Sequence, residues 1–179
     1  MNKWIAITIF AVGLSLPSPG RADEPTGKLY DAGLTFKNEA NKATPLSSWA
    51  GKKVVMSMIY ASCHGACPLI IKHLKAVQTA LDKKKIVASF VLITFDPKND
   101  TPEKLGHYRE LMEINRPNWF LLSGTENATR KLSMILGIKY SKNKKTGEVM
   151  HDNRIVLLNE KGQLVRNLDG LDSSLDELF

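Results

Sequence analysis

Residues 54–68 read VVMSMIYASCHGACP, and the other expected elements follow on from this stretch. Its first part, Val54–Tyr60, is almost continuously apolar, as is typical of a central strand covered on both faces. Its second part is a loop that holds both cysteines of the chain. Apolar residues then recur at helical spacing and predict a helix that follows the loop; they are Ile70, Leu74, Val77 and Leu81.

The two cysteines, Cys63 and Cys67, lie four residues apart, and Pro68 follows directly. Proline is favoured at the first position of a helix, so Pro68 is expected to open the helix. Residues four apart on a helix share one face, with Cβ atoms about 5–6 Å apart. A disulfide needs a separation near about 4 Å, which an irregular first turn could supply. The spacing therefore leaves both a disulfide and a shared metal ion open.

The chain has 179 residues and is 43% apolar, which suits one globular domain with its own core. Lys3, an apolar run and small residues up to Ala22 have the pattern of a secretory signal peptide. We expect a signal peptide at 1–22, a flexible tether at 23–33 and one folded domain at 34–179. The protein is then exported to the periplasm. An uncleaved leader, anchored in the inner membrane, is the alternative.

The formal net charge is +7, and the lysines are mostly scattered along the chain. Nucleic-acid binding would need a basic stripe with exposed aromatic side chains. The sequence therefore predicts a solvated surface and no nucleic-acid partner. An exported protein also stands in an oxidising compartment, where a cysteine pair is oxidised, held reduced by a partner or loaded with metal.

The rest of the chain predicts an α/β sandwich with a mixed sheet. Thr101 and Thr125 have the sequence pattern of helix N-caps, and Gly137 that of a helix end. The region before residue 150 is expected to be a polar, lysine-rich loop. Residues 34–37 and 43–49 are expected to form a short hairpin and turn. The expected further strands are 86–94, 119–122, 155–158 and 163–168, and the expected further helices are 101–115, 125–137 and a tail helix at 173–179.

Four histidines could join the cysteines in a site. His73 and His107 are predicted to lie on exposed helix faces. His64, inside the cysteine loop, is either a solvated residue or a ligand and thiol activator. His151 precedes an expected strand, and its position alone does not decide whether it is a ligand or a loop histidine.

Other polar and sulfur-containing residues have simpler interpretations. Asp96 and Asp100 are expected to start a turn and cap a helix. A role for Asp96 or Asp152 in orienting His151 is a further hypothesis. The methionines near these segments, Met56, Met58 and Met150, are expected to fill the core.

Three segments together resemble the Sco/SenC family. They are Cys63-x-x-x-Cys67-Pro68, the run from Phe95 to Leu105 with its Asp-Pro-x-x-Asp-Thr-Pro-Glu motif, and His151 before a strand. The resemblance runs from about Phe36 to the C-terminus. It implies a thioredoxin-like three-layer sandwich with an N-terminal extension, and copper bound by Cys63, Cys67 and His151. This chain has His64-Gly65-Ala66 where the family usually has proline and acidic residues, so His64 is a candidate extra ligand.

The resemblance implies a copper metallochaperone that carries Cu(I) or Cu(II) to an apo-cuproenzyme such as cytochrome c oxidase. Another copper chaperone or a thiol reductant would be a further partner. Two thiolates and one imidazole suit copper, whereas a structural zinc site would need a fourth ligand. The alternative is a thiol-disulfide oxidoreductase, in which Cys63 and Cys67 form the redox pair and a Cys63–Cys67 disulfide in the oxidised form.

Overall fold

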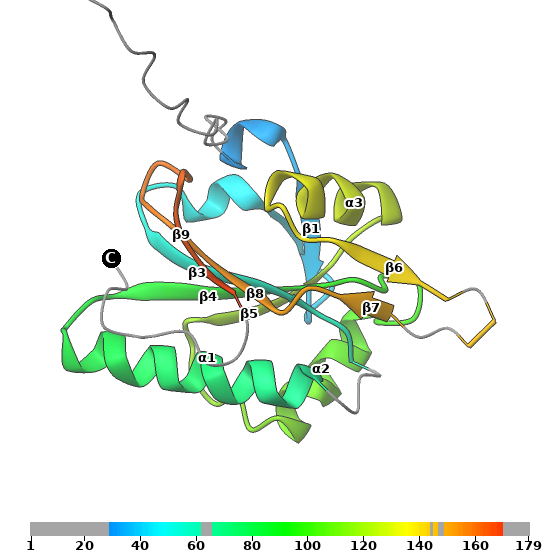
Figure 1. The fold of residues 1–179 in the computed structure, drawn as a ribbon, viewed down its shortest axis with the longest axis horizontal. Coiled ribbons are helices and arrows are strands. Elements are labelled where there is room, and N and C mark those ends of the chain that lie inside the picture. Colours follow the sequence, from blue (N-terminus) through cyan, green and yellow to red (C-terminus); the bar gives the residue numbers. More distant parts are fainter. Residues whose placement is uncertain (1–28, 62–65, 144, 147–148, 170–179) are drawn as a thin grey trace, which may run out of the picture.

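The computed structural model describes residues 29–61, 66–143, 145–146 and 149–169. Within these residues a sheet has the strand order β2-β1-β5-β4-β3-β8-β9, and a separate hairpin pairs β6 with β7 (Figure 1). The strands are β1 Thr35–Asn38, β2 Ala43–Pro45, β3 Lys53–Ile59, β4 Ala88–Thr94, β5 Trp119–Ser123, β6 Tyr140–Lys142, β7 Val149–His151, β8 Arg154–Leu158 and β9 Leu164–Asp169. The helices are η1 Leu29–Ala32, η2 Leu46–Trp49, α1 Ala66–Lys83, α2 Pro102–Leu111 and α3 Glu126–Ile135, the first two of them 3-10 helices.

The central strand expected from the apolar run is confirmed as β3. It pairs in parallel with β4 and antiparallel with β8, and every residue after Lys53 is buried. β5 adds to β4 in parallel, and β1 adds to β5 in the antiparallel direction. The sheet is therefore mixed, as the sequence predicts.

Helices cover both faces of the sheet. α1 and α2 lie on one face and α3 on the other (Figure 1). Alternate residues of β4 face the two layers: Phe90 and Leu92 pack with α1 and α2, while Val91 and Ile93 pack on the other side. Burial of one side chain of this size stabilises the folded protein by about 1.5–3 kcal/mol relative to leaving it exposed. Two hydrophobic cores thus hold the expected three-layer sandwich together.

The first two main helices differ at their ends from the expected bounds. α1 begins at Ala66, so Pro68 lies within its first turn, where backbone N–H groups have no partner inside the helix. α2 begins as expected: the Thr101 hydroxyl accepts a hydrogen bond from the backbone N–H of Lys104 at 3.3 Å. It ends at Leu111 rather than near Asn115. The cause is Glu113, whose φ of 50° is left-handed and cannot continue the helix.

The third helix, α3, has the ends that the sequence predicts. The Thr125 hydroxyl accepts a hydrogen bond from the backbone N–H of Ala128 at 3.1 Å. Gly137 follows the helix with a φ of 64°, a conformation that favours glycine. A Cβ atom there would meet a guanidinium nitrogen of Arg154 at 2.9 Å. This glycine therefore ends the helix and makes room for the Arg154 guanidinium.

The region before residue 150 is not the simple loop that we expected. Tyr140–Lys142 pair with Val149–His151 as an antiparallel hairpin, with Tyr140 opposite His151. The short strands carry polar and charged residues, so their pattern resembles a loop. Pairing with each other, rather than burial, makes them strands.

The N-terminal part of the chain is packed where the structure describes it. Leu29 is 2% exposed, and its N–H bonds to the carbonyl of Gly162 at 2.9 Å. The expected tether is therefore folded onto the domain from Leu29 onward. The expected signal peptide at 1–22 and tail helix at 173–179 lie outside the described residues. None of the helices in the described part of the chain has the length and hydropathy of a membrane-spanning segment.

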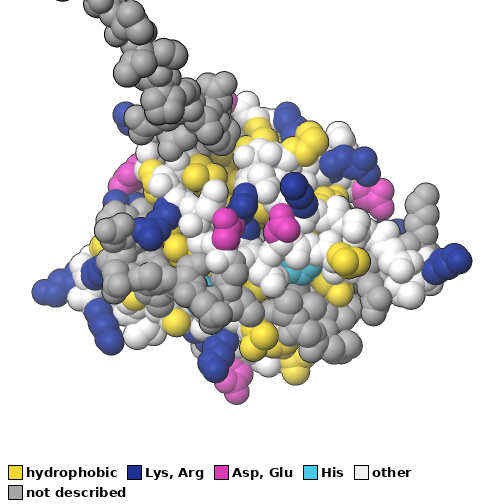
Figure 2. Space-filling model, in the orientation of Figure 1, with side chains coloured by type: hydrophobic (Ala, Val, Ile, Leu, Met, Phe, Trp, Pro, Cys, Tyr) yellow, Lys and Arg dark blue, Asp and Glu magenta, His cyan; other side chains and the backbone are white. Residues whose placement is uncertain are grey.

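Charged side chains are spread over the visible surface. On the face shown in Figure 2, Lys and Arg side chains are scattered among acidic and apolar ones. They do not form a continuous stripe on this face.

Candidate metal site

The candidate site lies at the carboxyl ends of the parallel strands, where α/β proteins place their ligands. β3 ends at Ile59, opposite Thr94 at the end of β4. Tyr60 and Ala61 follow β3, and the chain then enters the cysteine loop. Cys63 and His64 lie outside the described residues. The backbone of Cys67 is in the first turn of α1, but its side chain is also outside the description.

His151 comes to this edge from far along the chain. Its ring lies 4.5 Å from the ring of Phe95 and 6.1 Å from the ring of Tyr60, measured between centroids. Tyr60 precedes Cys63 by three residues, and three residues span at most about 10 Å. The tertiary structure therefore holds His151 within reach of the start of the cysteine loop.

The Nδ1 atom of His151 has a backbone oxygen within hydrogen-bond distance. This nitrogen lies 3.1 Å from the backbone carbonyl oxygen of Asp152. A neutral imidazole that donates Nδ1–H to this oxygen has its lone pair on Nε2, the form in which histidine binds metals. The carboxylates of Asp96 and Asp152 accept hydrogen bonds from Lys142 and from the backbone of Lys139, respectively. A role for either carboxylate in orienting His151 stays a hypothesis.

A buried carboxylate, Asp100, anchors the base of the cysteine loop. Asp100 is 1% exposed and accepts hydrogen bonds from the backbone N–H of Ala61 at 2.9 Å and from the hydroxyl of Thr94. Its other oxygen is buried with no hydrogen-bond partner in the described part of the chain. Burial raises the pKa of this carboxyl. The N-cap of α2 is Thr101, so the expectation that Asp100 caps the helix is wrong. Asp100 instead bonds to residues at the ends of β3 and β4.

Asp96 has the opposite electrostatic setting. Burial by itself would raise the pKa of Asp96, but hydrogen bonds from Lys142 and Asn99 and the charge of Lys142 outweigh burial and lower it. The Lys142 ammonium lies 2.7 Å from one carboxylate oxygen, and the Asn99 amide lies 2.8 Å from the other. The backbone carbonyl of Asp96 accepts from the N–H groups of Asn99 and Asp100, as expected for a turn.

The remaining candidates have mixed outcomes. His107 is exposed, as predicted. His73 is half-buried, and its Nε2 is buried without a hydrogen-bond partner among the described residues, so the prediction of an exposed side chain is wrong. Met56 and Met58 are core residues, as expected, but Met150 is 74% exposed. Alternation along β7 turns Met150 to the face opposite His151.

Sequence reasoning missed the contribution of Tyr60, Phe95 and Asp100. Each follows the end of a buried strand, and the carboxyl ends of neighbouring parallel strands meet at one edge. The position of these three residues after predicted buried strands could have indicated that they lie near the site. Among the described residues, no three His, Cys, Asp or Glu side chains form a group able to hold a metal ion. The ligand set of Cys63, Cys67 and His151 therefore remains a prediction.

A family model described as SCO1/SenC matches residues 23–178. The chain belongs to the SCO1/SenC family. A curated SCO2-like protein of Rickettsia typhi is 25% identical over 132 residues, which cover 69% of this chain and 63% of that protein. The chain thus spans less than two thirds of the length of this relative.

Solved structures agree on the fold. A SCO1/SenC family lipoprotein from Bacillus anthracis matches with a TM-score of 0.72 at 23% identity, over 78% of this chain and 84% of that one. Arabidopsis thaliana ScoI, solved with copper bound, gives 0.71 at 18% identity, over 81% and 90%. BsSco, a member of the Sco family of cytochrome c oxidase assembly proteins with a disulfide switch, gives 0.67 at 22%, over 77% and 81%. The expected thioredoxin-like sandwich is confirmed.

Proposed function

We propose that this protein binds one copper ion through Cys63, Cys67 and His151 and delivers it to an apo-cuproenzyme, such as the copper-site subunit of cytochrome c oxidase. The observation that supports this best is the ring of His151 packed beside Tyr60 and Phe95, next to the start of the cysteine loop. The family supports the same cargo, because Arabidopsis thaliana ScoI has been solved with copper bound. Copper is here the substrate that the protein carries.

The donor set fits copper as a transient cargo. Thiolate and imidazole ligands suit copper in either oxidation state, and three ligands leave a coordination position open for a donor from the partner. In this proposal the protein acts after export, in the periplasm or anchored to the inner membrane. A second copper chaperone would load it, and a thiol reductant would keep Cys63 and Cys67 able to bind.

A copper titration tests the ligand assignment. The reduced protein should bind about one copper ion per chain in anaerobic competition with a chromophoric Cu(I) chelator. His151→Ala should weaken binding by more than about 100-fold, because loss even of a group that only supports a ligand costs 10–100-fold. His107→Ala, which removes an exposed histidine on α2, is the matched control and should bind as wild type does. Equal affinities for wild type and His151→Ala would contradict the assignment.

A thiol-disulfide oxidoreductase is the second candidate, and the disulfide switch described for BsSco favours it. In this reaction one thiolate of the pair attacks a disulfide of the target and forms a mixed disulfide. The second thiolate then releases the target as a dithiol and leaves a Cys63–Cys67 disulfide. Two electrons pass to the target, and no metal moves.

Oxidase assembly in cells separates the two candidates. Copper delivery predicts that Cys63→Ser and His151→Ala each abolish assembled oxidase, since each removes a metal ligand. Electron transfer predicts that only the cysteine variants fail, because His151 does not take part in thiol exchange. The measurement is oxidase activity and copper content in cells that carry each variant. Normal assembly with His151→Ala would favour the oxidoreductase.

A further inference from the structure

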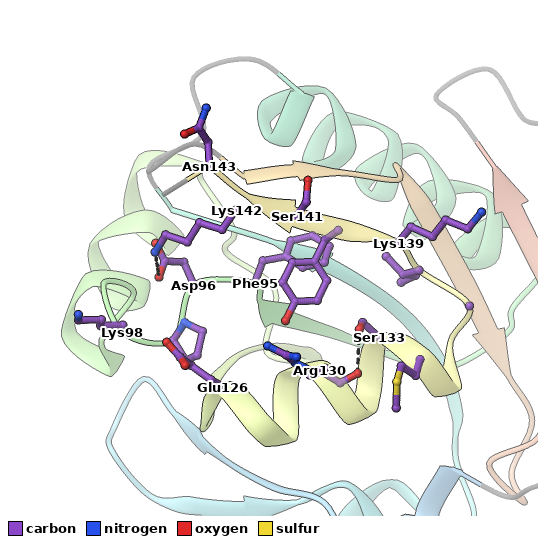
Figure 3. Close-up of a pocket in the computed structure, with 15 residues that line it drawn as sticks. Phe95, Asp96, Lys98, Glu126, Arg130, Ser133, Lys139, Ser141, Lys142 and Asn143 are labelled. Carbon is purple, nitrogen blue, oxygen red and sulfur yellow. Dashed lines mark hydrogen bonds and ion pairs between the residues drawn. The ribbon is translucent and has the colours of Figure 1, made fainter. Parts of the chain in front are cut away.

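A groove of about 900 Å³ lies on the α3 side of the sheet, close to the candidate metal site. Its walls are α3, the segment 137–143 that contains β6, and the turn after β4 (Figure 3). We call it the α3–β6 groove. Its inner end is aromatic: the rings of Phe95 and Tyr140 lie 5.0 Å apart, and Phe95 also packs on His151 at 4.5 Å. One phenylalanine therefore separates the groove from the proposed copper ligand.

The groove carries an excess of positive charge. Lys98, Arg130, Lys139 and Lys142 line it, against Asp96 and Glu126. Lys142 already neutralises Asp96 in an ion pair of 2.7 Å, as Figure 3 shows. Within the described part of the chain, the side chains of Lys98, Arg130 and Lys139 make no ion pair or hydrogen bond, and all three are exposed. They come from three parts of the chain: the turn after β4, the helix α3, and the segment between α3 and β6.

The groove also has apolar walls. Phe95 and Ile138 are each 4% exposed, and Tyr140 is half-buried above them. Met134, on α3, is 70% exposed at the rim. A volume of this size suits a bulky ligand with apolar parts rather than a single small anion. The combination selects a ligand that carries both carboxylates and apolar side chains.

We propose that the α3–β6 groove docks an acidic segment of the protein that receives the copper, with carboxylates beside Lys98, Arg130 and Lys139 and an apolar side chain against Tyr140 and Met134. This inference rests on the proposed delivery of copper and names the chemistry of the partner. Docking there places the partner next to the ring of Phe95, and so beside His151. Charge complementarity of this kind steers encounter and fixes orientation.

Fluorescence anisotropy with the metal-free, reduced protein tests the groove. The probe is a short labelled peptide that alternates Glu with Leu and Phe. It should bind the wild-type protein at low salt and dissociate as salt rises, because exposed charge pairs are screened. Arg130→Glu/Lys139→Glu should weaken binding at least about tenfold, since two attractive contacts become repulsive.

The control variant carries the same change in net charge elsewhere. Lys42→Glu/Lys161→Glu reverses two exposed lysines in the turns that follow β1 and β8, neither of which lines the groove, and should bind the peptide as wild type does. Arg130→Ala/Lys139→Ala, a milder change, should fall between the two. A matched peptide with Lys in place of Glu should not bind.

Several results would overturn the groove as a docking site. The first two are absence of peptide binding and equal binding by the groove and control variants. The third is displacement of the peptide by inorganic phosphate added at the same concentration of negative charge. The fourth is a dimer of the wild-type protein that dissociates in the groove variant. The copper titration is independent: Arg130→Glu/Lys139→Glu should bind copper as wild type does. If the wild-type protein binds copper but not the peptide, the groove is rejected and the proposed function is not. If it binds the peptide but not copper, the proposed function is rejected and the peptide site is not.

Discussion

At the scale of single residues, Asp96 and Asp100 show how one turn creates two different carboxyl environments. Thr94 connects them: its hydroxyl donates to Asp100 and accepts from the backbone N–H of Asp96 at 2.9 Å. Asp96 faces the ammonium of Lys142, while Asp100 is buried and accepts a hydrogen bond from the backbone N–H of Ala61. The surroundings of Asp96 favour its ionised form, and those of Asp100 favour its neutral form. The carboxyl groups should therefore respond to pH in opposite ways.

We predict opposite pH dependences for Asp100→Asn and Asp96→Asn. The pKa of Asp100 is raised above its ordinary value of 3.8, so its contribution to stability is present below 3.8 and is lost as the pH rises through the raised pKa. The pKa of Asp96 is lowered from 3.8, so its contribution is present above 3.8 and is lost as the pH falls through the lowered pKa. Neither asparagine titrates.

The measurement is urea unfolding of wild type and both variants over a pH series from about 2.5 to about 6. The free-energy difference between wild type and Asp100→Asn should shrink as the pH rises, while that between wild type and Asp96→Asn should grow. Each variant serves as the control for the other. Parallel curves for the two variants would contradict the opposite environments.

At the scale of elements, α3 depends on its ends, because it is short and only one side is buried. Its N-cap is Thr125, and the chain leaves it at Gly137, whose carbonyl accepts a hydrogen bond from Arg154 at 2.7 Å. The same arginine binds Asp169, at the end of β9, with its Nε 2.5 Å from a carboxylate oxygen. α3 is also a wall of the α3–β6 groove. Its stability therefore bears on the proposed docking site.

We predict that Thr125→Ala lowers the free energy of unfolding by about 1 kcal/mol, because the N-terminal N–H groups of α3 lose their acceptor. That corresponds to a decrease of about 2–4 °C in Tm for a protein of this size. Thr79→Ala is the matched control. Thr79 is exposed in the C-terminal half of α1 and donates to the carbonyl of Lys75 at 3.0 Å.

The control should be neutral or slightly stabilising, because alanine has the higher helix propensity and no cap is lost. Thermal unfolding followed by circular dichroism measures both variants. Equal losses of stability for the two would show that the Thr125 cap contributes nothing beyond an ordinary threonine.

At the scale of the whole molecule, the sheet with its two cores brings the candidate site together. Ser57, inside β3, donates to the carbonyl of Arg154 at 2.9 Å, which secures β8 against the central strand. The chain just before β8 carries His151, so this pairing sets how near the histidine comes to Tyr60. The metal site is thus a property of strand order rather than of the loop alone.

Local sequence patterns account for the features of the fold that the sequence predicts. β3, β4 and the start of α2 and α3 were predicted, because apolar runs and cap residues act on their immediate neighbours. The hairpin of β6 and β7, the early end of α2 and the half-buried His73 were not. Short polar strands, a left-handed Glu113 and contacts between layers leave no local apolar pattern.

By itself the sequence determined the order and type of the main elements, the position of the cysteine pair after a buried strand, and the three segments that resemble Sco/SenC proteins. Only the tertiary structure decided that His151 packs beside Phe95 and Tyr60, that Asp100 anchors Ala61, and that charged residues from three parts of the chain line one groove. The physical reason is the separation along the chain of the residues that interact. Propensity and periodicity depend on nearby residues, whereas these contacts depend on strand pairing and layer packing between residues far apart in the chain.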